Sequence, residues 1–247
     1  MGEVARVLES NPEWSQIRLE HDGYSGWVHT ASLFLCGAGE AESYQRGCNA
    51  IVSASQAEAR DDAGVNVQKI PFATLVTVME SDGEDSLIQL PDGRMWRLKT
   101  SDLLPLDQRP LPTPEGIAQT LDLLHRFVGI PYLWGGRTPY GYDCSGLSGT
   151  FYAFMGVSIP RDADQQFQAG MVVEGEPQPG DLLFFGEADE ESDAGFRITH
   201  VAIALGAGEF IHANGADWGI SYNSFDPNSP RYQAWLDKNY RSARRFR

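Results

Sequence analysis

The stretch YDCSGLSGTFYAF, residues 142–154, combines a reactive side chain with the pattern of a buried helix. Its apolar residues, Leu147 and Phe151 among them, recur at helical spacing and predict one inward-facing side. Asp143 is a favourable N-cap residue, so Cys144 would occupy the first helical position. Backbone N–H groups and the helix dipole there favour a thiolate and could bind an oxyanion. The stretch alone leaves two readings open, a buried structural cysteine and a nucleophile.

A cysteine nucleophile needs a base, and two histidines follow downstream. His200 lies in THVAIALG, residues 199–206, and His212 lies in EFIHAN, residues 209–214. Both segments read as strands, and the glycines between them predict a tight turn. In such a hairpin the two imidazoles can be cross-strand neighbours on one face, where one accepts the thiol proton and the other orients it. The alternative is a pair of structural sheet histidines.

A zinc site is a competing interpretation of the same residues. Cys144, His200, His212 and Asp143 are all chemically acceptable ligands. However, the chain has no CxxC, HxxxH or HExxH spacing around them. We therefore expect no metal and no other cofactor.

The chain before these motifs is rich in short strands. Residues 1–38 and 39–106 each carry β-branched and aromatic runs separated by turn-prone acidic segments, with an Asp-Gly pair typical of a hairpin in PDGR. The two sets resemble each other and predict two small barrels, the first incomplete. Three tryptophans are expected to fill these barrels: Trp14, Trp27 and Trp96.

The proline-rich residues 107–116 read as a linker, and residues 117–247 as a second kind of domain. A helix is expected from Pro114 to Gly129, with Val128 on its inner face. Helices followed by an antiparallel sheet give an α+β fold.

Composition limits the partners and the compartment. The 247 residues carry a formal net charge of −15, which argues against binding nucleic acid or an anionic membrane through charge. No apolar run approaches the roughly 18 residues of a membrane span. The first residues lack the features of a signal peptide, so we expect a cytoplasmic protein if Met1 is the native start, and a periplasmic or extracellular one if a leader was removed. Three cysteines make no disulfide framework, although Cys36 and Cys48 could pair.

Four blocks in order carry a family resemblance: VGIPYLWGGRTPYGYDCSGL, IPRDADQQ, PQPGDLLFFG and ITHVAIALGAGEFIHANG. Together they resemble the NlpC-type cell-wall cysteine peptidases, which have a papain-like α+β fold. The resemblance implies that Cys144 is the nucleophile, His200 the general base and His212 the residue that orients it. Tyr132 would lie near the oxyanion.

The upstream barrels resemble bacterial SH3-like domains, and the order of the domains resembles that of the γ-D-glutamyl-L-diamino-acid endopeptidases. The resemblance implies that Tyr24 of the first barrel closes the substrate pocket and that Trp134 lines it. It further implies that Asp143 holds the substrate's α-ammonium, with Ser145 adding polar contacts. Arg161 either shapes the cleft or packs the junction of helix and sheet.

The Cys-His site predicts a cysteine endopeptidase, and the resemblance implies that its substrates are murein peptides such as L-Ala-γ-D-Glu-diamino acid. We expect a monomer, with neither nucleic acid nor membrane insertion involved. The free amine that the resemblance implies favours short, trimmed peptides and a role in recycling or turnover. Two alternatives remain: a non-catalytic peptidoglycan-binding protein, and an amidase or acyltransferase on the same fold.

Overall fold

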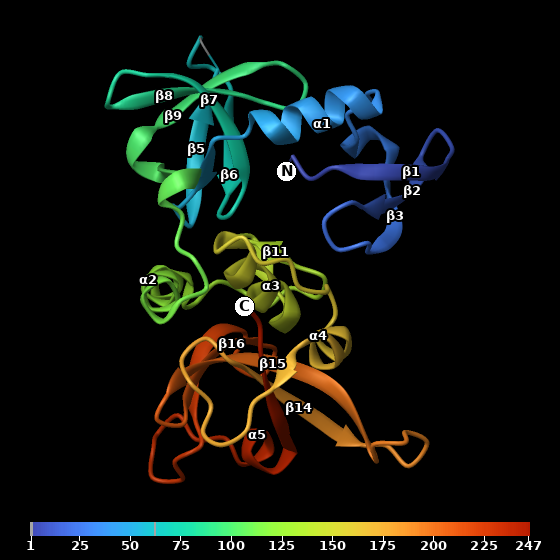
Figure 1. The fold of residues 1–247 in the computed structure, drawn as a ribbon, viewed down its shortest axis with the longest axis vertical. Helices are drawn as coiled ribbons and strands as arrows, with labels where there is room; N and C mark the ends of the chain where they lie inside the picture. Colours follow the sequence, from blue (N-terminus) through green and yellow to red (C-terminus); the bar gives the residue numbers. More distant parts are fainter. Residues whose placement is uncertain (1, 62) are drawn as a thin grey trace. The chain divides into compact units, whose positions relative to one another are not determined.

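The computed structural model describes residues 2–61 and 63–247, and the chain divides into two compact units between Arg109 and Pro110 (Figure 1). Met1, where the expected first barrel begins, lies outside the described residues. The division falls within the segment expected as a linker. None of the described helices is both long and apolar enough to cross a membrane.

The first unit begins with a small antiparallel sheet in the order β1-β2-β3 (Figure 1). Its strands are β1 (Ala5–Ser10), β2 (Trp14–Leu19) and β3 (Ser25–His29). Trp14 and Trp27 were expected to fill this barrel, and the structure contradicts that prediction, because their side chains are 39% and 49% exposed. Trp14 stacks on His29 at 3.9 Å between ring centroids instead. With three strands, the sheet has too small an inner face to cover them.

The first unit also contains a seven-stranded sheet, in the order β10-β4-β7-β8-β9-β5-β6. Its buried cluster contains Ile70, Val76, Ile88 and Trp96, so the expectation for Trp96 is confirmed. The strands are β4 (Ala50–Val52), β5 (Gln56–Arg60), β6 (Val67–Pro71), β7 (Leu75–Ser81), β8 (Asp85–Gln89), β9 (Met95–Lys99) and β10 (Leu103–Pro105). The predicted Asp-Gly hairpin joins β8 to β9, with Gly93 at φ 81°. That the first unit consists of two SH3-like barrels divided near residue 38 stays a prediction.

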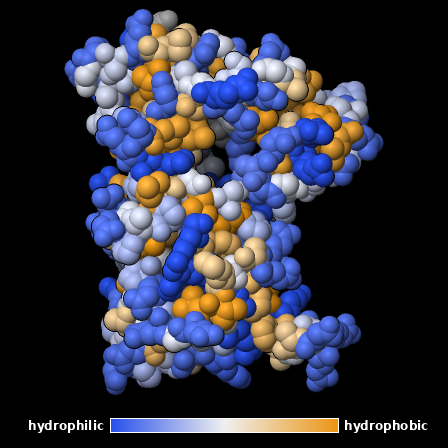
Figure 2. Space-filling view, in the orientation of Figure 1, coloured by the Kyte–Doolittle hydropathy of each residue, from blue (hydrophilic) through white to orange (hydrophobic). Residues whose placement is uncertain are grey.

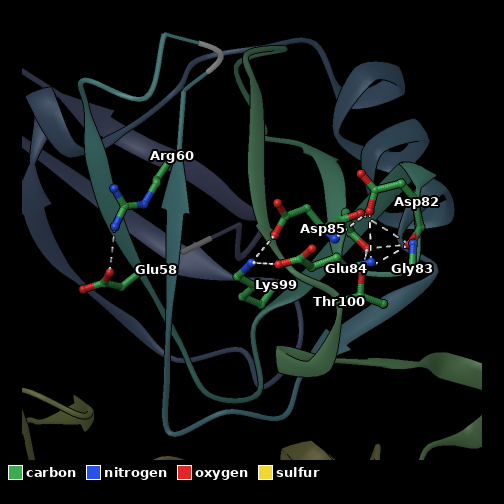
Figure 3. A network of polar contacts seen from close by, with 10 residues as sticks. Glu58, Arg60, Asp82, Gly83, Glu84, Asp85, Lys99 and Thr100 are labelled. Atoms are coloured by element: carbon green, nitrogen blue, oxygen red, sulfur yellow. Dashed lines mark hydrogen bonds and ion pairs between the residues drawn. The ribbon is translucent and has the colours of Figure 1, made fainter.

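The β7–β8 turn is held by polar contacts that Figure 3 shows. Asp82 accepts hydrogen bonds from the backbone N–H groups of Glu84 and Asp85, at 3.0 and 2.8 Å. The Lys99 side chain, from β9, forms ion pairs with the carboxylates of Glu84 and Asp85. Helix α1 (Ala38–Gly47) links the two sheets and was not predicted; all its residues keep some exposure, so it carries no apolar pattern to detect.

The second unit starts with α2 (Pro114–Leu124), which Thr113 caps by accepting a hydrogen bond from the Gly116 N–H. The expected helix to Gly129 is too long. A single 3-10 turn, η4 (His125–Phe127), follows α2, and Val128 is exposed rather than buried. Gly129, at φ 87°, adopts a backbone conformation that ends the segment as expected.

A six-stranded antiparallel sheet in the order β13-β18-β14-β15-β16-β17 is the centre of the second unit. Neighbouring residues on a strand point to opposite faces. Phe184 contacts Phe167 of α4 (Ala163–Ala169), whereas Leu183 and Phe185 pack with Leu236 of α5 (Ala234–Asn239). Helices α4 and α5 therefore cover opposite faces. Helix α3 (Cys144–Phe154) contacts β15 (Phe196–Gly206) and β16 (Glu209–Asn214) (Figure 1). This arrangement confirms the α+β expectation.

The remaining elements complete the list of bounds. The helices are α3 (Cys144–Phe154), α4 (Ala163–Ala169) and α5 (Ala234–Asn239), with 3-10 turns η1 (Thr30–Ser32), η2 (Thr100–Asp102) and η3 (Leu106–Gln108). The strands are β11 (Arg137–Thr138), β12 (Gly141–Tyr142), β13 (Met171–Val172), β14 (Leu182–Ala188), β15 (Phe196–Gly206), β16 (Glu209–Asn214), β17 (Gly219–Ser224) and β18 (Tyr240–Arg245).

Candidate active site

Cys144 is the first residue of α3, as the sequence predicts. The N-cap Asp143 is extended, with φ −93° and ψ 176°, and its carboxylate accepts a hydrogen bond of 2.6 Å from the Gly146 N–H. A side chain at Gly146 would place its Cβ 2.1 Å from the Gly136 carbonyl oxygen, so this turn of the helix must pass closely against the preceding loop. The cap and the glycine together fix where Cys144 emerges.

Burial dominates the electrostatics of Cys144. It raises the pKa of the thiol to about 11, with the Asp143 carboxylate adding to the rise. Hydrogen bonds from the backbone N–H groups of Val201 and Ser145 act in the opposite direction but do not outweigh it. Burial therefore outweighs the preference for a thiolate that the helix start provides, because loss of hydration costs the anion more than the helix terminus returns. A neutral thiol needs a base to become a nucleophile.

His200 and His212 meet on one face of the β15–β16 hairpin. The register pairs Ile203 with Ile211, and continuing it makes the two histidines diagonal neighbours rather than direct partners. His200 Nε2 and His212 Nδ1 are 2.7 Å apart, a hydrogen bond between buried rings. Burial and the neighbouring His212 hold the pKa of His200 well below its usual range, so His200 is a neutral acceptor near pH 7. The predicted pairing of the two rings is confirmed.

The Val201 N–H links this pair to Cys144, since the thiol sulfur accepts its hydrogen bond one residue beyond His200. The cysteine at the start of α3 and the base on β15 are thus brought together although more than fifty residues separate them in the chain.

Tyr132 lies beside the same thiol. Its backbone N–H donates to the Trp218 carbonyl at 3.0 Å, and a bridge to Tyr142 ties it to the segment just before the helix. Burial and the proximity of Cys144 and Asp143 raise the pKa of the Tyr132 hydroxyl to about 12. The hydroxyl therefore stays protonated at neutral pH and can donate a hydrogen bond.

Arg161 completes a buried ion pair beneath the helix start. Its guanidinium donates to both oxygens of Asp143, at 3.1 and 2.6 Å, and to the Ser145 hydroxyl at 2.8 Å. Asp143 also accepts from the backbone N–H groups of Gly135 and Gly146. Arg161 was expected either to shape the cleft or to pack the junction of helix and sheet. The structure places it next to the site, where it fixes Asp143 and Ser145 on either side of Cys144.

The same contacts bear on the roles expected of Asp143 and Ser145. A carboxylate has about four lone-pair positions, and those of Asp143 already receive the guanidinium, two backbone N–H groups and the Ser145 hydroxyl. Both residues are buried. Their contact with a substrate ammonium stays a prediction, and it would require sharing these acceptors.

Two further expected pocket residues are exposed. Trp134 is 86% exposed and lies on the loop between Tyr132 and the helix. Tyr24 belongs to the first unit and is also partly exposed, and its role stays a prediction. Exposed apolar side chains of this kind contribute to the mixed surface of both units in Figure 2, where hydrophobic areas alternate with hydrophilic ones.

Sequence reasoning missed two residues behind His212. Asn223 of β17 is buried and its Oδ1 is 2.7 Å from His212 Nε2. Asp217 Oδ2 is 3.7 Å from the same nitrogen. Neither lies in a motif, because only the pairing of β16 with β17 brings them to His212.

Within residues 2–61 and 63–247, no three His, Cys, Asp or Glu side chains are grouped so as to hold a metal ion. Cys36 and Cys48 are free thiols, so the pairing left open for them does not form here.

Comparisons with known proteins agree with this geometry. Residues 129–241 match the NlpC/P60 family, and residues 1–33 match the bacterial dipeptidyl-peptidase Sh3 domain. Two relatives are called γ-D-glutamyl-L-lysine dipeptidyl-peptidase. The one from Bacillus subtilis (strain 168) is 30% identical over 86% of this chain and 70% of its own length. The one from Bacillus cereus (strain ATCC 10987 / NRS 248) is 26% identical over 100% of this chain and 73% of its own length.

The fold is shared with a crystal structure of an NlpC/P60 family protein from Bacillus cereus ATCC 10987. The TM-score is 0.83 at 24% sequence identity, over 98% of this chain and 79% of that one. The papain-like α+β fold and these relationships define a cysteine peptidase, a hydrolase. The chain belongs to the NlpC/P60 family, with an SH3-like region at its N-terminus.

Proposed function

We propose that this protein hydrolyses the bond between γ-D-Glu and the L-diamino acid of murein peptides that have a free N-terminal L-Ala. The arrangement of Cys144 beside the hydrogen-bonded His200 and His212 carries the proposal for the chemistry. The substrate class is supported by the two relatives called γ-D-glutamyl-L-lysine dipeptidyl-peptidase, whose similarity extends over both units.

The first half-reaction forms a thioester. Neutral His200 takes the proton of the Cys144 thiol, and the sulfur attacks the γ-carbonyl carbon of the glutamyl residue. The Cys144 backbone N–H and the Tyr132 hydroxyl donate hydrogen bonds to the developing oxyanion. Collapse of this intermediate breaks the C–N bond, and His200 returns the proton to the leaving amine of the diamino acid.

The second half-reaction regenerates the thiol. His200 removes a proton from water, whose oxygen attacks the thioester carbonyl, and the sulfur leaves and is reprotonated. His212 orients the His200 ring in both halves through the 2.7 Å hydrogen bond. The products are L-Ala-D-Glu and a peptide or amino acid that begins with the diamino acid.

We propose that substrate selection uses residues of the SH3-like region and of the peptidase domain. The SH3-like region would consist of a first barrel, residues 1–38, and a second barrel, residues 39–106. Tyr24 of the first barrel would close the pocket. Trp134 would line the pocket, and Asp143 and Ser145 would bind the free amine. A pocket that requires this amine accepts short, trimmed peptides, which fits turnover or recycling.

The test compares the wild type with Cys144→Ala on L-Ala-γ-D-Glu-L-Lys and on the diaminopimelate analogue, with products identified by mass spectrometry. Loss of cleavage in Cys144→Ala, with full activity in the control Cys36→Ala, is the expected result. Cys36 is an exposed thiol and therefore a matched control. Cleavage that survives in Cys144→Ala refutes the mechanism. Binding to sacculi with no peptide release from wild type would support a non-catalytic role instead.

A further inference from the structure

The hydrogen bonds behind the proposed base continue past His212. His200 Nε2 contacts His212 Nδ1, and His212 Nε2 contacts Asn223 Oδ1, each at 2.7 Å. His212 and Asn223 are fully or almost fully buried, with 0% and 3% exposure. The chain of contacts runs from β15 through β16 to β17, across three neighbouring strands.

The far end of this chain fixes the positions of the protons. Asn223 Nδ2 donates to the Arg231 carbonyl at 2.8 Å, which turns Oδ1 of the same amide toward His212. An amide oxygen only accepts, so His212 Nε2 must carry a hydrogen. In neutral His212, Nδ1 is then an acceptor, and His200 Nε2 must donate to it. What remains on His200 is an unprotonated Nδ1, the nitrogen that can accept a proton.

A carboxylate lies beside the same contact. Asp217 Oδ2 is 3.7 Å from His212 Nε2, and the negative charge raises the pKa of His200 against the effect of burial. The contact with His212 lowers the pKa of Asp217 to about 2, and hydrogen bonds from Ser221, Asn214 and Gln233 add to this and hold the carboxylate in place. The Asp217 carboxylate therefore stays ionised at neutral and mildly acidic pH.

We propose that Asn223 and Asp217 are positioning residues of the active site. Asn223 fixes His212, and through it His200, in the tautomer that leaves His200 Nδ1 free for the thiol proton, and Asp217 stabilises the imidazolium that the transfer creates. This inference rests on the proposed function of Cys144 and His200.

The other groups around the two rings do not compete for these roles. Phe185 and Phe210 contact the rings and carry no charge. The Ser221 hydroxyl donates to Asp217 at 2.9 Å. Asp143 and Arg161, the charged groups near Cys144, neutralise each other in their ion pair. Among these groups, Asp217 is therefore the one whose charge acts on the histidine pair and is not neutralised by an opposite charge.

The first experiment reads the tautomers directly. Long-range ¹H–¹⁵N spectra of the full chain with ¹⁵N-labelled histidine, at neutral pH and without substrate, should show His200 and His212 both protonated at Nε2. Asn223→Ala should lose this preference at His212. A wild-type spectrum with His212 protonated at Nδ1 overturns the proposal, even if Asn223→Ala fails to fold. This readout does not depend on activity.

The second experiment uses kinetics on the tripeptide. Asn223→Ala should lower kcat about 100-fold with KM within about twofold, as expected when an orienting partner in a triad is lost. The matched control is Asn228→Ala, which removes an exposed asparagine five residues further along the chain, whose side-chain amide contacts Asp226. It should leave kcat unchanged. Equal losses in the two variants, or a loss in KM alone, overturn the role of Asn223.

The third experiment uses opposite charge changes. Asp217→Asn removes an anion that raises the pKa of His200, so the acidic limb of kcat should move to lower pH. Asn223→Asp keeps the acceptor and adds an anion, so the limb should move to higher pH. Shifts in the same direction, or none, contradict the proposal. If the tautomers and shifts agree but Cys144→Ala still cleaves the peptide, the proposed function fails and the hydrogen-bonded chain stands as structure.

Discussion

The ion pair beneath Cys144 gives the sharpest stability prediction. The side chains of Arg161 and Asp143 are only 10% and 9% exposed, and the two terminal guanidinium nitrogens donate to the two carboxylate oxygens. Arg161→Met keeps the apolar stem but leaves Asp143 buried without its cation. Breaking a buried pair in this way costs about 3–5 kcal/mol. The backbone N–H groups of Gly135 and Gly146 still stabilise the carboxylate, so we expect about 3 kcal/mol.

Urea unfolding followed by circular dichroism and by tryptophan fluorescence measures this cost. With an m value of about 2 kcal/mol/M, a loss of about 3 kcal/mol lowers the midpoint by about 1.5 M. The double variant Arg161→Met with Asp143→Asn should lose less than the sum of its single changes, because no uncompensated charge remains.

An exposed pair in the same unit is the control. Arg231 and Glu209 are 3.2 Å apart and 49% and 42% exposed, so Arg231→Met should cost no more than about 1 kcal/mol. If Arg161→Met costs no more than this control, or if the double variant is additive within about 0.5 kcal/mol, the reasoning about the buried pair is refuted.

Three further predictions concern the helix, the thiol and the base. Gly146→Ala should lower the free energy of unfolding by about 1–3 kcal/mol, because the new Cβ would meet the Gly136 carbonyl oxygen. Gly149→Ala places its Cβ in open space and should be neutral or slightly stabilising, so equal effects of the two variants on urea unfolding would contradict the packing. Because burial raises the pKa of Cys144 to about 11, its alkylation by iodoacetamide, followed by peptide mass spectrometry, should speed up about tenfold per pH unit from pH 8 to 10; a plateau below pH 9 would argue against a neutral resting thiol. Because burial lowers the pKa of His200, the base stays unprotonated as pH falls below 6.5, so the acidic limb of kcat/KM should lie well under 6.5; a midpoint at or above 6.5 would contradict a buried base.

The parts of the site that could be predicted from the sequence are those formed by residues close together in the chain. Asp143 and Cys144 are adjacent, and a cap followed by an apolar helix has a recognisable pattern. The tight turn at Gly206–Gly208 placed His200 and His212 on one hairpin face, and their ring nitrogens meet at 2.7 Å. These features depend on neighbours in sequence or on one short turn.

What failed depends on surroundings that no local pattern encodes. The helix start at Cys144 favours a thiolate, which would lower the pKa of the thiol, but burial within the second unit raises that pKa instead. Trp14 and Trp27 alternate like core residues, yet a three-stranded sheet cannot cover them. Asn223 and Asp217 reach His212 only through strand pairing, and Arg161 meets Asp143 through the packing of the segment before α4. Such contacts follow from the tertiary fold.

We propose that Cys144, with His200 as its base, opens a γ-glutamyl bond in a peptide whose amine is free. The most direct measurement is the mass spectrum of products from L-Ala-γ-D-Glu-L-Lys and from its N-acetylated form, each with wild type and Cys144→Ala. We expect L-Ala-D-Glu and free lysine from the unblocked peptide with wild type alone, and little product from the acetylated one. Release of the same products by Cys144→Ala, or cleavage at the L-Ala–D-Glu bond, would contradict it.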